Sequence, residues 1–335
     1  MTDEQHYEYK FEDHSVLLRV LERPVFAPIV RALPLALTPN QLTIGGHLLV
    51  WFASAAVLMA ERSGAVHLAG LAVACFLYDL SDCIDGMFAR HTQRTSRLGE
   101  LLDHGLDAVS LPLVPLCVGV ALQQPDWIIL SATAAVSFMN FATLMHGFRV
   151  GYGHRGTIGS GEGSLVAALT CGVAAAIGVA PLAAPIFGSV SIAGWLLLSL
   201  VGGGLTALVS MRGLLRTPRD FVSLTLLFAA IVAWYATGGL SMTATGLLFA
   251  AVGSYHSCKI TCARLLRQPL ALADVPLLVF MLAGAGAALA LDLGEGAQVL
   301  AASGVMAYAF ARSAILFLST VKALQAPRPR ETSPP

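Results

Sequence analysis

The chain has 335 residues and no formal net charge at pH 7, and 56% of its residues are hydrophobic whereas only 12% are charged. A soluble domain of this length needs far more charged surface, so the composition excludes an ordinary soluble enzyme and indicates a polytopic membrane protein. The six cysteines lie scattered through apolar stretches, which is typical of small buried side chains and not of a zinc site.

The polar N-terminus lacks the basic and apolar regions of a cleaved signal peptide. Residues 15–33 are too interrupted by Arg and Pro to cross a membrane, and they predict an interfacial amphipathic helix on its cytosolic surface. Ten apolar runs then predict an all-α bundle of about ten transmembrane helices. The runs are 41–60, 65–89, 99–122, 126–149, 164–187, 190–213, 219–237, 240–264, 272–291 and 297–321.

The positions of Lys and Arg test this count, because cytosolic loops hold the excess of basic residues. With the N-terminus in the cytosol, Arg90, Arg94 and Arg97 share one cytosolic loop, whereas Arg62 is the one basic residue in the loops on the opposite side. Both ends are therefore predicted to be cytosolic. We divide the chain into an N-terminal segment (1–40), a catalytic bundle (41–213), C-terminal transmembrane helices (214–321) and a disordered tail (322–335).

Four aspartates stand near the cytosolic ends of the second and third predicted spans: Asp82, Asp85, Asp103 and Asp107. Each pair lies on one helix face, and the short loop between the spans lets the two pairs face each other. Four ionised carboxylates would repel one another at this depth unless cations neutralise them. Carboxylate ligands favour Mg²⁺, Mn²⁺ or Ca²⁺ over zinc. The pattern predicts a two-metal site, whose usual chemistry is phosphoryl transfer.

Small residues accompany these carboxylates. Gly86 and Ala89 share the helix stripe of the first pair, and Gly99 precedes Asp103 by one turn. Small side chains here would let a bulky ligand approach the metals, although close packing between helices explains such residues as well when each is taken alone.

Together with Arg90, these residues match the signature DxxDGxxARx(8)GxxxDxxxD of the CDP-alcohol phosphotransferases, integral membrane enzymes of phospholipid synthesis, which the chain therefore resembles. The stretch "ALTPNQLTIGG" (36–46) is similar to the entry into the first span in that family. "LGELLDHGLDA" (98–108) resembles the choline and ethanolamine phosphotransferase branch, and about ten spans suit the same branch.

The resemblance implies that a CDP-alcohol donor binds with its pyrophosphate on two Mg²⁺ or Mn²⁺ ions. The hydroxyl of a lipid acceptor, diacylglycerol or a similar lipid, then attacks the distal phosphorus and CMP is released. Asp82, Asp85 and Asp103 are assigned as metal ligands, with Asp107 completing the site. Gly86, Ala89 and Gly99 would make room for the nucleotide.

Other site residues each carry two interpretations. Arg90 can hold the nucleotide phosphate or serve only as a topological charge. Asp107 is the usual general base in the wider family, whereas His104 carries an imidazole, a group that suits base catalysis near neutral pH better than a metal-bound carboxylate does. Asn40 can contact the nucleotide, although capping the first span is favoured. Glu162, between two glycines in a predicted cytosolic loop, can contact the head group or a metal.

Further polar residues inside the spans are functional candidates by default, but helix-to-helix hydrogen bonds explain them equally well. They are His47, His67, His146, His256, Lys259, Asn140 and Arg312.

Two alternatives remain open from the residues. One is a phosphatidyltransferase that uses CDP-diacylglycerol and a small polar alcohol. The other is an ion-coupled transporter. The carboxylates argue against it because they lie near the helix ends, whereas transporter sites lie near the membrane midplane. Abundant Ala and an excess of Arg over Lys favour a bacterial inner membrane. Membrane lipids are expected partners and nucleic acids are not, and the family resemblance implies a homodimer.

Overall fold

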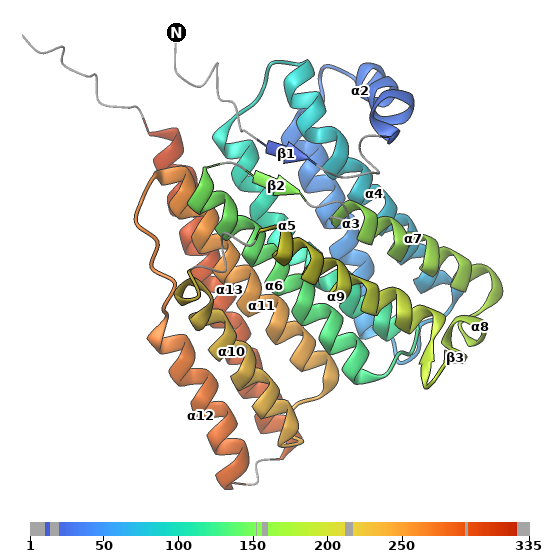
Figure 1. Ribbon diagram of the computed structural model, residues 1–335, viewed down its shortest axis with the longest axis vertical. Helices are drawn as coiled ribbons and strands as arrows, with labels where there is room; N and C mark the ends of the chain where they lie inside the picture. Colours follow the sequence, from blue (N-terminus) through green and yellow to red (C-terminus); the bar gives the residue numbers. More distant parts are fainter. Residues whose placement is uncertain are drawn as a thin grey trace, which may run out of the picture.

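The computed structural model describes residues 11–13, 20–151, 153–155, 160–211, 217–291 and 294–326. Long helices dominate this part of the chain (Figure 1). They are α3 (Pro39–Met59), α4 (Ala65–His91), α5 (Arg97–Ala121), α6 (Asp126–Val150), α7 (Ser160–Ile177), α9 (Ile192–Ser210), α10 (Arg219–Ala236), α11 (Met242–Leu266), α12 (Val275–Leu291) and α13 (Glu295–Gln325).

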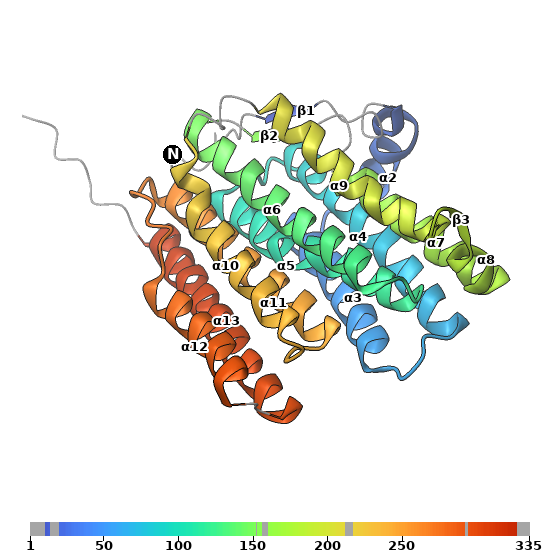
Figure 2. The same cartoon turned by 60° about the horizontal axis from the view of Figure 1, so that its bottom comes forward.

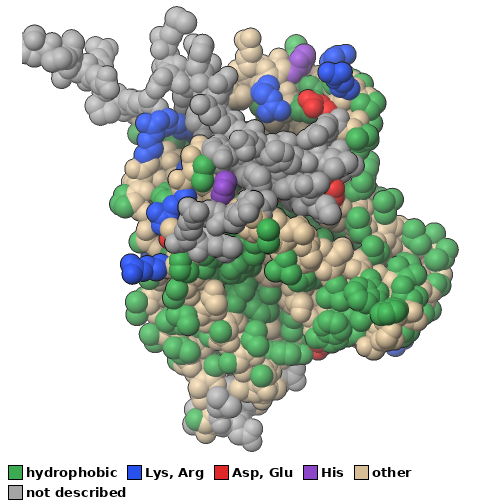
Figure 3. All heavy atoms as spheres, viewed as in Figure 1, with side chains coloured by type: hydrophobic (Ala, Val, Ile, Leu, Met, Phe, Trp, Pro, Cys, Tyr) green, Lys and Arg blue, Asp and Glu red, His purple; other side chains and the backbone are tan. Residues whose placement is uncertain are grey.

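These helices correspond in position to the ten predicted apolar runs. Among the described residues, seven helices are long and apolar enough to cross a membrane, namely α3, α4, α5, α6, α9, α10 and α13. Helices α7 and α12 supply shorter apolar segments, Gly161–Ile177 and Val275–Ala287. Figure 3 shows Lys and Arg side chains mainly over the upper part of the drawn face and hydrophobic side chains over much of the part below. The all-α membrane bundle is confirmed, and ten crossings stay a prediction.

The fifth predicted run, 164–187, is wrong in its second half. Helix α7 ends at Ile177, and Gly178 adopts φ +87°, a left-handed conformation that glycine reaches without strain. A short helix α8 (Ala180–Ala183) and a two-stranded hairpin of β3 (Pro185–Phe187) and β4 (Val190–Ser191) follow. Pro181 and Pro185 prevent the helix from continuing through this apolar stretch.

The N-terminal segment is helical from residue 20 to Ala32. A short π-helix (Glu22–Phe26) leads into α2 (Ala27–Ala32), whereas residues 15–19 of the predicted amphipathic helix lie outside the described residues. Phe26 and Val30 are buried in a cluster with Phe88 of α4. Strand β1 (Phe11–Asp13) pairs in parallel with β2 (Gly153–Arg155), which places residues 11–13 beside the end of α6.

Two large groups of buried apolar residues form the core. One joins α3, α4, α5, α6, α7 and α9, and includes Val50 and Leu71. The other joins α6 to α10, α11, α12 and α13, and includes Phe141 and Trp234. Figure 2 shows α5 and α6 running between these two sets of helices. The central helices are therefore held from both sides, and α5 is one of them.

Caps and a loop contact fix the ends of α3, α4 and α5 relative to one another. Ser96 caps α5 by accepting a hydrogen bond from the Gly99 backbone at 3.0 Å. In the loop between α4 and α5, Arg94 donates to the carbonyls of Leu35 and Leu37, each at 3.2 Å. This contact ties the α4–α5 loop to the segment that leads into α3.

At the other end of the chain, α13 runs to Gln325, beyond residue 321 where the last span was predicted to end. Residues 327–335 of the predicted disordered tail lie outside the described residues.

Candidate metal centre

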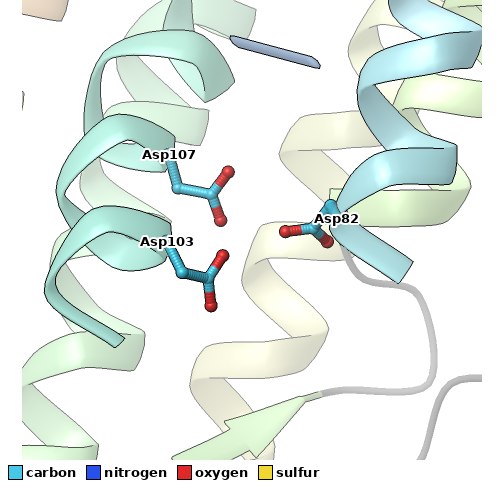
Figure 4. Close-up of side chains that lie close together, drawn as sticks. All are labelled: Asp82, Asp103 and Asp107. Carbon is cyan, nitrogen blue, oxygen red and sulfur yellow. The ribbon is translucent and has the colours of Figure 1, made fainter. Parts of the chain in front are cut away.

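Three carboxylates come together between two neighbouring helices (Figure 4). Asp82 comes from α4, and Asp103 and Asp107 come from consecutive turns of α5. Each offers one oxygen atom, and these three atoms lie within 4.8 Å of one another. All three side chains are half-buried. The antiparallel arrangement predicted from the short loop therefore brings Asp82 to the Asp103–Asp107 face.

The spacing and chemistry of these donors fit a hard divalent cation. Mg²⁺ and Ca²⁺ bind oxygen at about 2.0–2.6 Å, so two oxygens on one such ion lie at most about 5 Å apart. The three carboxylate oxygens meet this limit. Three clustered negative charges in a half-buried place repel one another, and a bound cation removes that repulsion. An oxygen-only ligand set also favours Mg²⁺, Mn²⁺ or Ca²⁺ over softer metals.

Asp85 lies outside this group of three. Its side chain is buried, and its Oδ2 accepts a hydrogen bond of 2.5 Å from Thr43 Oγ1 of α3. The sequence placed Asp85 on the Asp82 stripe, but a step of three residues turns a helix by about 300° and leaves the two side chains about 60° apart. That angle points Asp85 toward α3 and Asp82 toward α5.

The small residues beyond Asp82 leave the α4 surface accessible. Gly86 and Ala89 are half-buried, and Arg90 is exposed. A Cβ atom added to Gly86 would lie 3.4 Å from Nη1 of Arg90, so the guanidinium group lies over this glycine. The small residues predicted to make room for the nucleotide, Gly86 and Ala89, thus lie on the same stretch of α4 as Arg90, which was predicted to bind its phosphate.

Asn40 does not cap α3, so the favoured interpretation of this residue was wrong. Thr38 is the cap: its Oγ1 accepts from the Gln41 backbone at 3.3 Å, and Gln41 Oε1 accepts from the Thr38 backbone at 2.9 Å. Pro39 takes the first helical position, where its fixed φ suits the helix, so the cap falls one residue before it. A Cβ atom on Gly99 would lie 3.4 Å from Asn40 Oδ1, which places Asn40 at the first turn of α5.

His104 lies beside Asp103 in the structure, whereas Glu162 lies in a helix and not in the predicted loop. His104 Nδ1 lies 3.9 Å from Asp103 Oδ2, and both side chains are partly buried. Glu162 is not in a loop as predicted, because α7 already begins at Ser160. A Cβ atom on Gly161 would lie 3.0 Å from Asp79 Oδ1. The first turn of α7 therefore packs on α4 one turn before Asp82.

Two partners of the α5 carboxylates were not predicted from the sequence. The Tyr78 hydroxyl donates to Asp107 Oδ1 at 2.5 Å, and Arg264 of α11 forms a salt bridge with Glu100, whose side chain is buried. Helical spacing was the available signal. Tyr78 stands one turn before Asp82, and Glu100 stands one turn before Asp103.

Comparison with known proteins points to the same family as the aspartate signature. Residues 36–201 match the family model described as CDP-alcohol phosphatidyltransferase. Cholinephosphotransferase 1 of Gallus gallus is 38% identical over 134 residues, which are 37% of this chain and 39% of that protein. Choline/ethanolaminephosphotransferase 1 of Arabidopsis thaliana is 34% identical over 120 residues, 34% of this chain and 30% of that protein. Cholinephosphotransferase 1 of Saccharomyces cerevisiae is 31% identical over 118 residues, 33% and 30% of the two chains. Each match spans well under half the length of the relative.

The relatives correct one expectation. They come from a bird, a plant and a yeast, so the expected bacterial inner membrane was wrong. That expectation rested on the excess of Arg over Lys and on abundant Ala, which follow the base composition of the coding DNA and carry no information about the compartment. The membrane-protein assignment rests on the helices and is unaffected.

Proposed function

The chain carries a CDP-alcohol phosphatidyltransferase domain over residues 36–201, and from this premise we propose that it transfers phosphocholine or phosphoethanolamine from a CDP-alcohol to the hydroxyl of diacylglycerol or a similar lipid, releasing CMP. The observation that supports this most directly is the meeting of Asp82, Asp103 and Asp107 at the spacing of one metal ion. The names of the relatives support the choice of head group.

We propose Mg²⁺ or Mn²⁺ as the metal, with two ions at full occupancy. Asp82, Asp103 and Asp107 would hold the first ion, and Asp85 would join as a ligand by exchanging its hydrogen bond with Thr43. When bound, the ions would neutralise the pyrophosphate and stabilise the leaving CMP.

The protein's own side chains supply binding and proton transfer. Arg90, exposed at the end of α4, would bind a phosphate of the nucleotide as a fixed cation, while Gly86 and Ala89 let it approach the backbone. As the acceptor oxygen bonds to the head-group phosphorus, the bond from that phosphorus to the CMP oxygen breaks. The hydroxyl proton passes to Asp107 or to His104. Asp107→Asn and His104→Gln separate these two, because loss of the general base removes the acidic limb of the pH–rate profile, where the rate falls as the base becomes protonated.

Asn40 and Glu162 are proposed contacts of lesser weight. Asn40 lies at the first turn of α5 beside Gly99, where its amide can meet the nucleotide. Glu162 would meet the head group from the first turn of α7. The family resemblance supports a homodimer, for which analytical ultracentrifugation in detergent is the test.

CMP release by purified protein in detergent tests the proposed function. The donors are CDP-choline, CDP-ethanolamine and CDP-diacylglycerol, each with and without acceptor, in the presence of Mg²⁺ or Mn²⁺. We expect release from a CDP-aminoalcohol with diacylglycerol, and none from folded Asp82→Asn or Asp103→Asn protein. Asp126→Asn is the matched control, because Asp126 hydrogen-bonds Tyr235 at the start of α6, away from the cluster. Folded wild-type protein that releases no CMP from any donor would refute the transferase.

A second candidate is transfer from CDP-diacylglycerol to a small polar alcohol. The description of the matching family model, a phosphatidyltransferase, favours it. Release of CMP from CDP-diacylglycerol alone among the donors would replace the first proposal with this one.

A further inference from the structure

A line of buried polar groups leads from α3 to the Asp107 carboxylate. Trp51 Nε1 donates to Ser110 Oγ at 2.8 Å, and Ser110 Oγ lies 2.7 Å from His47 Nδ1. His47 Nε2 in turn lies 3.9 Å from Asp107 Oδ1, the same oxygen that accepts from Tyr78. His47 is 2% exposed, Tyr78 3% and Ser110 0%. Three helices thus contribute to the surroundings of one carboxylate.

The hydrogen bonds in this line have one consistent direction. The indole N–H of Trp51 can only donate, so Ser110 Oγ accepts from it. The Nε2 atom of His47 faces a carboxylate, which favours the tautomer with its proton on Nε2. Nδ1 is then the acceptor, and the Ser110 hydroxyl donates to it. The donors therefore run from Trp51 to Ser110, to His47 and toward Asp107.

The His47 ring also packs against Tyr78, with 5.1 Å between ring centroids and 53° between the planes. Both residues therefore approach Asp107 from one side: the Tyr78 hydroxyl donates to Oδ1, and His47 Nε2 faces the same oxygen at 3.9 Å, just beyond hydrogen-bond distance. A carboxylate held at one oxygen presents its other oxygen in a fixed direction. We propose that His47 and Tyr78 are positioning residues that fix the Asp107 carboxylate for metal binding, and that Ser110 and Trp51 set the orientation of His47.

Helix-to-helix adhesion is the competing explanation for buried polar groups in a membrane protein. Ser137 of α6 illustrates it: this buried serine donates to the Phe249 carbonyl of α11 at 3.3 Å, a bond between two helices that involves none of the clustered carboxylates. The Ser110 line differs because it ends at a carboxylate of the cluster. Adhesion predicts a loss of stability on mutation, and positioning predicts in addition a loss of metal affinity.

The test measures Mn²⁺ affinity by electron paramagnetic resonance on the full chain in nanodiscs, together with thermal unfolding and CMP release. His47→Leu keeps the volume and removes the donor, whereas His47→Gln restores an N–H donor. Tyr78→Phe and Ser110→Ala remove the other links, and Ser137→Ala is the control. We expect His47→Leu and Tyr78→Phe to weaken Mn²⁺ binding by about 10–100-fold, the usual effect of losing a group that orients a metal ligand. His47→Gln should recover most of the affinity, and Ser137→Ala should leave it unchanged.

The inference rests on the proposed function because it takes Asp107 as a metal ligand. Mn²⁺ affinity tests the inference, and CMP release tests the proposed function. Wild-type protein that binds Mn²⁺ without releasing CMP would refute the transferase, and the variant affinities would still decide the role of His47. Wild-type protein that binds no Mn²⁺ would overturn the inference. Wild-type affinity in folded His47→Leu would also overturn it, and if that variant does not fold, wild-type affinity in Tyr78→Phe has the same meaning.

Discussion

Replacing Arg264 by Met removes the salt bridge to the buried Glu100 carboxylate. The Glu100 side chain is 6% exposed and that of Arg264 16%, and their salt bridge joins the first turn of α5 to the end of α11. Removing one member of a buried ion pair costs about 3–5 kcal/mol, because the other charge stays desolvated. With about 2–4 °C for each kcal/mol in a large domain, the melting temperature should fall on the order of 10 °C.

The double variant Glu100→Gln/Arg264→Met separates the burial penalty from the value of the pair. A neutral amide is easier to bury than a lone carboxylate, so the double variant should recover much of the stability that Arg264→Met loses. Thermal unfolding of purified protein in detergent, followed by tryptophan fluorescence, measures this cycle. CMP release is compared at a temperature where all variants are folded. A lower rate in Arg264→Met would show that this salt bridge helps to hold α5 in position.

Two results would refute the reasoning. If Arg264→Met melts within a degree or two of wild type, Glu100 is not held buried by this partner. If the double variant is less stable than Arg264→Met, the loss arises from packing by the arginine stem and not from an uncompensated charge.

Three further perturbations test the site. Gly46→Ala would put a Cβ atom 1.8 Å from Ser81 Oγ and should cost about 1–3 kcal/mol by forcing α3 and α4 apart, whereas Gly45→Ala, with nothing within 4 Å, should melt like wild type. Thr43→Val removes the donor to buried Asp85 and should cost about 1–3 kcal/mol, and a melting curve unchanged from wild type would contradict this. Chelation by EDTA should abolish CMP release, and Mg²⁺ or Mn²⁺ should restore it; activity that survives dialysis against EDTA would exclude an exchangeable metal.

The helices and the carboxylate cluster were accessible from the sequence because each depends on short-range geometry. An apolar run of sufficient length has few alternatives to a helix in a membrane. Two aspartates four apart in α5 share a face whatever surrounds them, and the short loop to α4 limits where Asp82 can lie. The break after α7 was not predicted because the alanines around Gly178 keep the stretch 164–187 apolar throughout. The glycine and the two prolines indicated a turn there, but the continuous hydropathy outweighed them.

Features that depend on how helices rotate against one another were not accessible. Helix geometry sets Asp85 about 60° away from Asp82, but no local pattern predicts that α3 packs on that side of α4 and that Thr43 becomes its partner. The same holds for Tyr78 and His47, which meet at Asp107 from two helices. His47 stood out as a buried polar candidate, but only packing identifies its target.

The acidic stripe of α5 explains how the bundle accommodates so many carboxylates. Glu100, Asp103 and Asp107 follow one another at single-turn spacing, and side chains of α11 and α4 meet them. Arg264 of α11 neutralises Glu100, and Tyr78 of α4 donates to Asp107. Asp103 faces Asp82, a like charge, across the gap between α4 and α5. A cation at this position would bind Asp82 and Asp103 together and remove the repulsion between them. Metal binding should therefore stabilise the α4–α5 contact as well as activate the donor, and Mn²⁺ should raise the melting temperature of wild-type protein but not of Asp103→Asn.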